Sequence, residues 1–337
     1  MADVTDPAFR RIVAECGKPD VFFTEFVSAD GLAHPAAREK LLRDLSYTEA
    51  ERPIVAQLFS SKPENIKVAA KLCAELGFDG VDINMGCPDR SIEKQGAGAS
   101  MIKNPEKAKA VIRAAKDGIK ESGRSIPVSV KTRIGYSREE IDTWLPVLLS
   151  EDIAALTVHL RTRKEMSEVP AHWEYMQRIV DLRDKLCKTT LIVGNGDVRS
   201  VADGDEKARE TGADGIMIGR AVFGNPWIFS SQTIKRKNKK TFADIYHFVL
   251  QKFGKKDRYW LRAKDNTDIK TKLETLVKHA ALFEELLGDV KSFAVMKKHF
   301  KAYVNGFSGA KELRNKLMEA GNDAASVRSI ISTFLAG

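Results

Sequence analysis

The chain of 337 residues is long enough for one large domain and a smaller one, because single hydrophobic cores stop growing near roughly 250–300 residues. Its composition, 43% hydrophobic and 30% charged, is that of a folded protein, and no apolar run approaches the roughly 20 residues that span a bilayer, so disordered and membrane-spanning classes are excluded. The amino terminus, MADVTDPAFRR, has acidic residues where a signal peptide needs a basic and then an apolar stretch, so a cytoplasmic protein is expected.

Short apolar runs recur along the first two thirds of the chain and predict seven β-strands. Helical segments separate them: one begins at Asp6-Pro7, one lies between Ser61 and Gly77, and one begins at Asn104-Pro105. Apolar strands without polar alternation, joined by helices, are typical of a parallel sheet buried on both faces. The strands are expected at 21–23, 54–58, 80–83, 127–130, 155–158, 191–193 and 215–218.

A polar side chain stands at the carboxyl end of each predicted strand, which favours a (β/α) barrel. A barrel builds its site from the loops at this end of all its strands, whereas a doubly wound sheet concentrates its site at one switch point. Such a barrel has eight strands. Because the first helix begins almost at once, we expect an α/β TIM (β/α)8 barrel whose first strand is missing, through truncation or a misplaced start. The polar residues are Glu25, Gln57, Asn84, Lys131, His159, Asn195 and Arg220.

One cysteine, Cys87, stands in a different setting from the other three. Cys16 and Cys73 lie on apolar helix faces and Cys187 lies in a Leu-rich connection, which is typical of core cysteines. No Cys-x-x-Cys pair or His partner at zinc-ligand spacing is present, so neither a disulfide framework nor a metal site is indicated. Cys87 lies between a glycine and a proline directly after a strand, which places a thiol at the mouth of the predicted barrel.

The last two strand ends have the features of a phosphate site. The stretches LIVGNGDV (191–198) and GIMIGRAVFGNPWIF (215–229) each offer backbone N–H groups at a helix start, and Arg220 adds a positive charge. Two ordinary glycine turns are the alternative. The stretch QGAGAS (95–100) lacks the full dinucleotide-binding pattern and is interpreted as a loop on the substrate side.

The strand ends between Cys87 and the phosphate site carry further candidates. Lys131 and His159 are potentially cationic and could hold an anionic ring system such as the N1–C2=O edge of a reduced flavin. Each residue alone is more often an ordinary residue at the rim of a core. Gln57 and Asn84 add amide groups that could bind a planar heterocycle by donor and acceptor pairs.

The composition changes after the last strand, which predicts a barrel domain at 1–234 and a basic helical domain at 235–337. Residues 231–337 hold 22 Lys and Arg against 11 Asp and Glu, whereas the rest of the chain holds 33 against 35. Helices are expected around 270–287, 292–303 and 323–335. A helical unit of this charge indicates a polyanionic partner, and Tyr259, Trp260 and Tyr303 could stack on bases or pack in the core.

Several stretches, in order, closely resemble signatures of the tRNA-dihydrouridine synthases. They are MADVTDPAFR, FTEFVSADGL, VAQLFS, DINMGCPDRSIEKQGAGASMIKNP, VSVKTRIG, VHLRTRKEM, VGNGDV and GIMIGRAVFGNPWIF, and MKKHFKAYVNGFSGAKELR (296–314) resembles the RNA-binding helical domain of that family. The resemblance covers residues 1 to about 229 and then 296–314. The Asn-Met-Gly-Cys-Pro element is its most specific part.

The resemblance implies a TIM-barrel enzyme that uses flavin mononucleotide (FMN) and NADPH, or NADH, to reduce the C5–C6 double bond of uridine in tRNA. Cys87 would be the acid that protonates C5, and the basic helical domain would bind the tRNA. A monomer without metal is expected. By the same resemblance the flavin-binding residues would be Gln57, Lys131, His159, Asn195, Gly196, Asp197, Gly219 and Arg220, and the residues near the uracil or its flanking phosphates would be Asn84, Arg161 and Arg163.

Two other functions stay open at this point. A small-molecule flavin reductase of the dihydroorotate or dihydropyrimidine dehydrogenase kind would share the barrel and the cofactor, but it would not need the basic helical domain. A non-catalytic RNA-binding protein that has lost its flavin is the other alternative. The presence of Cys87, Lys131, His159 and Arg220 argues against it.

Overall fold

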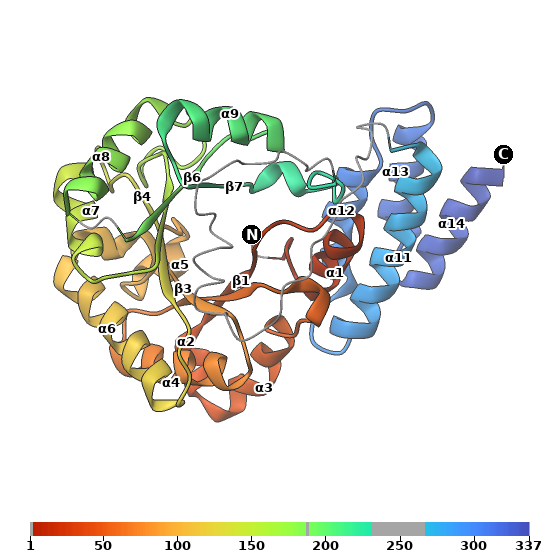
Figure 1. Cartoon of the computed structure of the whole chain (residues 1–337). Helices are drawn as coiled ribbons and strands as arrows, with labels where there is room; N and C mark the ends of the chain where they lie inside the picture. The colour runs from red at the N-terminus through yellow and green to blue at the C-terminus, as the bar shows by residue number, and fades with distance from the viewer. Residues whose placement is uncertain (1–2, 187–188, 231–266, 337) are drawn as a thin grey trace.

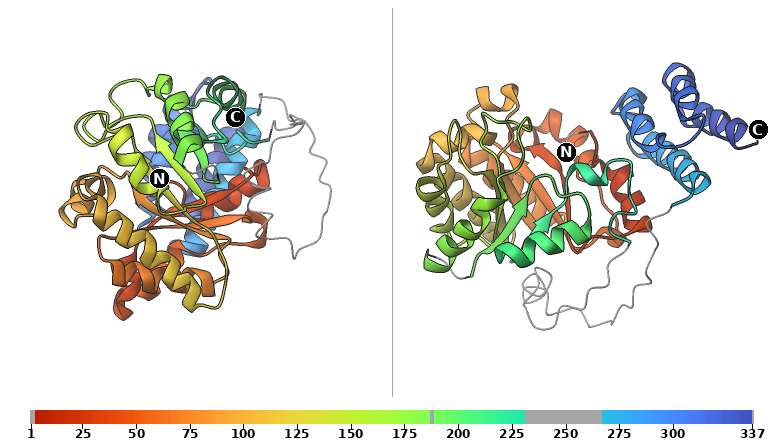
Figure 2. Two further views of the ribbon diagram at one scale, coloured as in Figure 1. Left: turned by 60° about the vertical axis from the view of Figure 1, so that its left-hand side comes forward. Right: turned by 90° about the horizontal axis from the view of Figure 1, so that it is seen from above.

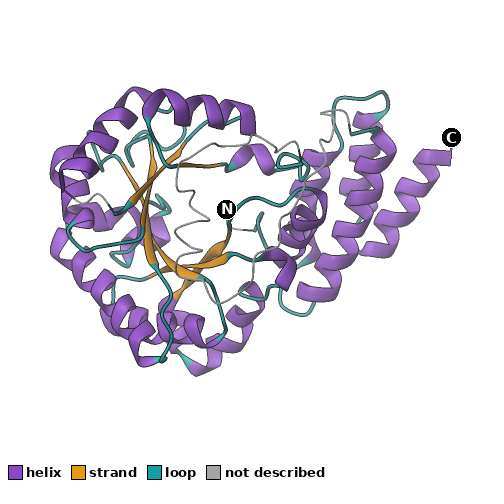
Figure 3. Ribbon diagram, viewed as in Figure 1, coloured by secondary structure: helices purple, strands orange, loops and turns teal. Residues whose placement is uncertain are grey.

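The computed structural model describes residues 3–186, 189–230 and 267–336. Its main feature is one sheet of seven parallel strands in the order β1 to β7, which curls into an open barrel with helices on its outer side (Figures 1 and 3). The strands are β1 (Phe22–Ser28), β2 (Ile54–Phe59), β3 (Gly80–Met85), β4 (Val128–Arg133), β5 (Ala155–His159), β6 (Leu191–Asn195) and β7 (Gly215–Met217).

All seven predicted strands are present, and the largest difference lies in the first. β1 continues to Ser28, well past its predicted end, because its pairing with β2 shifts register between Phe23 and Phe26 and then resumes. Glu25 therefore lies inside β1 and not at its end. In the described part of the chain β1 and β7 are the two edges of the sheet. The expected barrel that lacks one strand is confirmed.

Helices cover the outer face of the sheet, and most of them bury an apolar side, although α3 has no buried residue. The six residues of β3 are all buried, and α4 and α6 pack closely over this part of the sheet. Lys62, and not Ser61, is the N-cap residue of α4, whereas Asn104 caps α6 as predicted. The barrel helices are α1 (Pro7–Cys16), α2 (Ala29–Ala33), α3 (Pro35–Asp44), α4 (Pro63–Glu75), α5 (Arg90–Lys94), α6 (Pro105–Glu121), α7 (Ile141–Leu149), α8 (Met176–Leu186) and α9 (Val201–Thr211).

Helix α1 lies at the open side of the barrel, next to the helices of the carboxyl-terminal part (Figures 1 and 2). It begins where predicted, because the Asp6 carboxylate accepts a hydrogen bond from the N–H of Phe9 and Pro7 follows the cap. A buried ion pair of 2.8 Å joins Arg10 of α1 to Glu51 before β2. Helix α1 therefore connects the barrel with the carboxyl-terminal helices.

The carboxyl-terminal part is helical, as predicted, and stands to one side of the barrel (Figure 2). The helix α13 was not among the predicted ones, and it begins directly after Gly309, a residue that suggests a loop. Tyr303 is buried, so of the two predicted roles it packs in the core. The helices are α11 (Ile269–Leu287), α12 (Met296–Tyr303), α13 (Ala310–Ala320) and α14 (Ala324–Ala336).

Most of the predicted basic character falls outside the described residues. The runs KRKNKK (235–240) and 252–264, and with them Tyr259, Trp260 and the predicted domain boundary, lie there. Residues 267–336 hold 11 Lys and Arg against 8 Asp and Glu, a net charge of only +3. None of the described helices is long and apolar enough to span a bilayer.

Candidate active site

The carboxyl ends of β2 to β7 meet at one end of the barrel and bring the predicted site residues together. The register pairs Asn84 of β3 with Lys131 of β4, and His159 of β5 with Asn195 of β6. Gly219 and Arg220 follow β7, where a short 3-10 helix, η4 (Arg220–Val222), begins. The prediction that these residues share one site rests on parallel strands, and the observed sheet has that geometry.

A relay of amide groups connects the buried carboxylate of Asp82 to the Cys87 turn. The Gln57 amide donates to Asp82 at 2.8 Å, and its carbonyl oxygen accepts from the Asn84 amide at 3.0 Å. The Asn84 oxygen then accepts the backbone N–H of Cys87 at 2.9 Å. Burial raises the pKa of Asp82 to about 6. The relay fixes which way both amide groups face, because each has a donor on one side and an acceptor on the other.

Cys87 is half-buried, and its backbone is held on both sides. Its carbonyl oxygen accepts the N–H of Ala99 at 2.9 Å from the glycine-rich loop that follows. Gly98 has φ +61°, and a Cβ there would lie 2.6 Å from that same carbonyl oxygen. Burial raises the pKa of the Cys87 thiol, although the nearby charges of Arg133 and Lys131 oppose this. The thiol is therefore protonated at neutral pH and can donate a proton.

Two arginines connect the Cys87 turn to the loop after β5. Arg133 is buried and donates to the carbonyl oxygens of Gly86 at 2.8 Å, Thr162 at 3.0 Å and Met166 at 2.9 Å. Arg163 forms an ion pair with Glu93 of α5, with its Nε 2.9 Å from each carboxylate oxygen. These contacts hold the two loops that flank Cys87 in a fixed relation.

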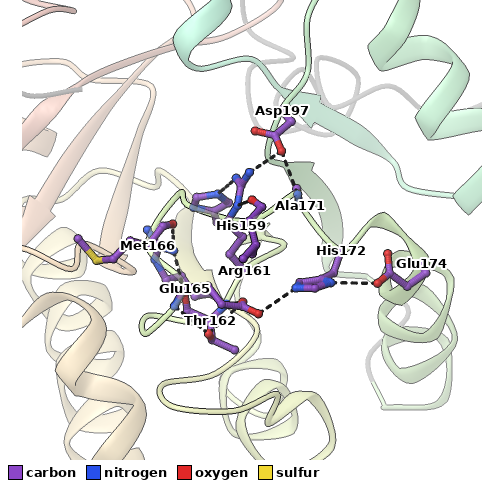
Figure 4. A network of polar contacts seen from close by, with 11 residues as sticks. His159, Arg161, Thr162, Glu165, Met166, Ala171, His172, Glu174 and Asp197 are labelled. Carbon is purple, nitrogen blue, oxygen red and sulfur yellow. Dashed lines mark hydrogen bonds and ion pairs between the residues drawn. The ribbon is translucent and has the colours of Figure 1, made fainter.

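His159 and Asp197 form the centre of a second cluster, which Figure 4 shows. The Arg161 guanidinium lies 3.0 Å from Nε2 of His159, binds the Asp197 carboxylate, and donates to the carbonyl oxygen of Val169 at 2.6 Å. Arg220 donates to the other oxygen of Asp197 at 2.6 Å. An arginine can only donate, so Nε2 of His159 accepts and its Nδ1 carries the proton.

His159 is a neutral ring and not the cation that the sequence suggested. Burial lowers its pKa to about 2, helped by the positive charges of Lys131, Arg133, Arg161 and Arg220. These residues come from three separate segments, strand β4, the loop after β5 and the start of η4, which only the fold brings together. The consequence is a ring that offers one N–H donor, at Nδ1, throughout the physiological pH range.

The glycines after β6 allow close packing around His159. Gly196 has φ +129°, and a Cβ there would lie 2.7 Å from the Ala171 side chain and 3.3 Å from the His159 ring. Trp173 lies under this turn and donates from its indole N–H to the Gly196 carbonyl oxygen at 2.9 Å. Asn195 donates to the carbonyl oxygen of Met217 at 2.8 Å, which joins the ends of β6 and β7.

The loop between β5 and η3 (Trp173–Tyr175) is held by its own polar network (Figure 4). Glu165 accepts the N–H of Thr162 at 2.7 Å and pairs with His172 at 3.0 Å. Glu174 contacts the other ring nitrogen of His172 at 3.0 Å. The hydrogen bond to Glu165 raises the pKa of His172 and favours the charged ring.

Lys131 differs from every other predicted site residue because no described residue hydrogen-bonds or ion-pairs with its ammonium group. Burial lowers its pKa to about 8, and the charge of Arg133 adds to this. The charge of Asp82 acts most strongly in the opposite direction and raises this pKa. A half-buried cation without a partner costs free energy, so this position is suited to a ligand that carries a carbonyl or an anionic group.

The structure thus places each predicted residue at this end of the barrel. Two of them, Arg161 and Arg163, bind other protein groups, although they were expected to meet the substrate. The guanidinium nitrogens of Arg161 bind inside the protein, so a contact with substrate would require it to exchange a partner. Arg163 has such a partner in Glu93, yet no contact of its Nη1 to a described residue is seen. Sequence reasoning missed Asp82 and Arg133, which lie two residues from Asn84 and Lys131 and so on the same faces of β3 and β4.

Comparison with known families agrees with this geometry. The model of the dihydrouridine synthase (Dus) family matches residues 1–334. This chain belongs to the dihydrouridine synthase family. Membership confirms the predicted family, and it makes the chain an enzyme of the flavin-dependent oxidoreductase class.

Two relatives resemble the chain along almost its whole length, and one solved structure resembles part of it. A "Probable tRNA-dihydrouridine synthase" of Staphylococcus aureus (strain COL) is 37% identical over 99% of this chain and 91% of its own length. A "Probable tRNA-dihydrouridine synthase 2" of Bacillus subtilis (strain 168) is 39% identical over 99% of this chain and 92% of its own. The solved structure of histamine dehydrogenase from Rhizobium sp. 4-9 aligns with 66% of this chain and 43% of its own, at 13% identity and a TM-score of 0.46.

Proposed function

We propose that the chain is a tRNA-dihydrouridine synthase that reduces the C5–C6 double bond of uridine in tRNA. In this proposal FMN binds at the strand ends, NADPH or NADH is the electron donor, and Cys87 is the acid. Membership in the dihydrouridine synthase family supports the reaction. The observation that supports the chemistry best is the half-buried, protonated thiol of Cys87, held by Asn84 at the mouth of the barrel.

The residues at the strand ends suit a flavin. Lys131 supplies a cation that has no hydrogen-bond partner in the described part of the chain, and His159 supplies an N–H donor at Nδ1. Gln57 offers the amide chemistry that a flat ring with carbonyl groups requires. Gly219 has open space on its Cβ side, and Arg220 beside it is exposed, which suits a phosphate. We assign Asn195, Gly196 and Asp197 to the same site as the turn that positions His159 and Arg220.

When bound, reduced FMN supplies the hydride that is transferred to C6 of the uracil. A negative charge then develops on C5 and the C4 carbonyl group, so a proton must reach C5. The Cys87 thiol donates this proton, the S–H bond breaks as the C5–H bond forms, and the thiolate is protonated again by water. Arg133 and Lys131 lie close enough to lower the energy of that transient thiolate.

The substrate side is assigned to Asn84, Arg161 and Arg163. Asn84 uses one amide hydrogen for Gln57 and keeps the second for a carbonyl group of the base. Arg163 uses Nε and Nη2 for Glu93, so its Nη1 is the group that we expect to meet a flanking phosphate. Arg161 acts mainly by holding His159 and Asp197 in place.

The target base has to leave its stack to enter the barrel, at a cost of a few kcal/mol. We propose that the carboxyl-terminal domain offsets this cost by binding the tRNA backbone. Lys301 and Arg314 line a groove of about 340 Å³ between α12 and α13, where phosphates could bind. The basic residues 235–264 add charge to the same domain. The cytoplasmic location and the monomeric state of the protein stay predictions.

The decisive experiment is anaerobic. The protein is loaded with FMN, reduced with NADPH, and mixed with unmodified tRNA while flavin reoxidation and dihydrouridine are followed. We expect fast, tRNA-dependent reoxidation that Cys87→Ala lowers by about 100-fold or more, in line with the loss of a general acid. Cys16→Ala, which removes another half-buried thiol, is the matched control and should retain the rate.

Three results would contradict the proposal in different ways. Reoxidation by free pyrimidines but not by tRNA would indicate a small-molecule reductase. Equal rates for Cys87→Ala and the wild type would remove the acid role while leaving the reaction in place. Failure of the purified protein to bind FMN would leave RNA binding without catalysis as the function.

A further inference from the structure

A buried cluster of polar side chains lies outside the active site, where helix α1 meets the carboxyl-terminal helices. Asp6 precedes α1, His279 lies on α11 and His299 on α12, and all three are fully buried. The two imidazole rings stand edge to face, with their centroids 4.5 Å apart, and Phe9 contacts both of them. Three segments thus contribute to one site, and Asp6 is far in the sequence from the two histidines.

These groups lack the partners that buried polar groups need. Within residues 3–186, 189–230 and 267–336, neither ring nitrogen of His279 or His299 has a hydrogen-bond partner, and neither has Oδ2 of Asp6. The hydroxyl group of Tyr303 beside them has none either. An unsatisfied buried polar group costs about 1–3 kcal/mol, so several in one place indicate that something else occupies the space between them.

The spacing and the chemistry of the three side chains indicate which kind of ion could occupy the space between them. One ligand atom from each residue lies within 4.8 Å of the other two. Ligands of one tetrahedral zinc ion lie about 3.4 Å apart, so a small contraction of the side chains would close the cluster around an ion. Two imidazoles and one carboxylate are a ligand set for zinc and related divalent transition metals, and not for Ca²⁺ or Mg²⁺, which prefer oxygen ligands alone.

We propose that Asp6, His279 and His299 bind one divalent transition-metal ion of the zinc class, which ties the amino-terminal segment to the carboxyl-terminal helices. All three ligands are fully buried, so the ion would be shielded from solvent and from substrate, which favours a structural role. The carboxylate of Asp6 would be neutralised by the ion. The site does not depend on the proposed flavin chemistry.

The spacing of these residues explains why the sequence does not reveal the site. Zinc motifs are recognised by ligands a few residues apart, whereas Asp6 and His279 are separated by most of the chain.

A ring contact from the barrel also limits the position of His299, because Phe223 packs edge to face on it with centroids 5.1 Å apart. The loop after η4 therefore closes over the cluster from the barrel side.

The test is elemental analysis of full-length, tag-free protein, before and after dialysis against Zn²⁺. We expect about one zinc-class ion per chain, and loss of that ion in His279→Gln and His299→Gln. His34→Gln removes an exposed histidine of the barrel and should retain the metal. A chelator should lower the melting temperature of the wild type and of His34→Gln, and Zn²⁺ should restore it.

A second measurement needs no variant and covers the case in which the histidine variants fail to fold. The wild type loaded with Co²⁺ should show the visible bands of tetrahedral cobalt without a near-ultraviolet sulfur band, because no ligand is a thiolate. A wild type that takes up neither Zn²⁺ nor Co²⁺ would overturn the proposal in favour of a buried water. Metal retained equally in all folded variants would overturn it as well.

Discussion

At the scale of single residues, the geometry around Cys87 depends on the small size of Gly98. The positive φ of Gly98 favours glycine, and the Cys87 carbonyl oxygen occupies the place where a side chain would begin. The N–H of the next residue, Ala99, donates to that oxygen. A change at residue 98 therefore acts on the position of the thiol without touching it chemically.

We expect Gly98→Ala to lower the free energy of unfolding by about 2–4 kcal/mol and to slow the tRNA-dependent reoxidation of flavin. The loss combines the cost of a positive φ with a clash at 2.6 Å. Gly123→Ala is the matched control, because Gly123 has φ +74° but no atom within 4 Å of its Cβ position. It should lose only about 1 kcal/mol and keep its activity. Equal losses in urea unfolding would show that the clash has no effect.

Lys131 permits a prediction on pH, because the pKa of its folded form, about 8, lies below its ordinary value of 10.5. Between these two values the unfolded state binds more protons than the folded state at this residue, so the Lys131 contribution to the free energy of unfolding rises with pH. Lys131→Met removes this contribution. The flavin-free variant should therefore be more stable than the wild type near pH 7, by on the order of 1–3 kcal/mol.

The advantage of Lys131→Met should shrink as the pH rises from about 8 towards 10, when the wild-type lysine loses its proton on folding. Urea unfolding of both proteins across this pH range measures the difference between their free energies of unfolding. The contributions of the other titrating groups are the same in both proteins and cancel in this difference. Lys40→Met, at an exposed position of α3, should show no such trend. An advantage that is constant from pH 7 to 10 would show that Lys131 is not desolvated. The variant should also bind FMN more weakly, if the proposed site is correct.

At the scale of elements, the strands were predictable because their apolar runs form a sheet buried on both faces, and parallel strands bring their ends together. The same reasoning predicted that Gln57, Asn84 and Lys131 lie close together, and the register of β2, β3 and β4 has them there. This reasoning could not identify Asp82 or Arg133, because their hydrogen-bond partners come from other strands and loops that are distant in the sequence. The neutral state of His159 was equally hidden, since it depends on burial and on cations that the fold brings together from β4 and two loops.

Arg133 provides a test of how two loops are coupled across β4. Its guanidinium binds three backbone carbonyl oxygens, and Arg133→Met would leave them without a donor at a cost of about 1–3 kcal/mol for each fully buried group. We expect a total loss of about 2–5 kcal/mol, because part of the cost will be relieved by water. Hydrogen exchange of residues 86–99 should become faster.

The control for Arg133 is an arginine that also joins two elements but lies at the surface. Arg178 of α8 pairs with Glu139 and Asp142 near the start of α7 and is 42% exposed. Arg178→Met should lose less than about 1 kcal/mol and leave the exchange of 86–99 unchanged. If both variants unfold at the same urea concentration as the wild type, the hydrogen bonds of Arg133 make no contribution to the free energy of unfolding.

At the scale of the whole molecule, contacts of α1 and of Lys291 join the barrel to the carboxyl-terminal helices. Lys291 follows α11 and lies 2.7 Å from Asp44 of α3, 3.5 Å from Glu25 of β1 and 3.8 Å from Asp3. Burial alone would lower the pKa of Lys291, but the hydrogen bond to Asp44 and the surrounding carboxylates raise it. Glu25 also accepts the N–H groups of Val4 and Thr5. One ammonium group thus neutralises the acidic residues that hold the amino-terminal segment.

Lys291→Met should weaken this junction more than any surface pair does. The substitution leaves Glu25 and Asp44 partly or fully buried without their cation, so we expect a loss of about 3–5 kcal/mol, which is the range for breaking a buried pair on one side. Lys278→Met is the control, because Lys278 also joins α11 to α1, through Glu15, but is 53% exposed and should contribute less than about 1 kcal/mol. Calorimetry should then resolve a separate early transition for the helical part of Lys291→Met, while Lys278→Met unfolds in the same way as the wild type. A single unshifted transition in Lys291→Met would mean that other contacts, such as the packing of α1 on α11, hold the two parts together without Lys291.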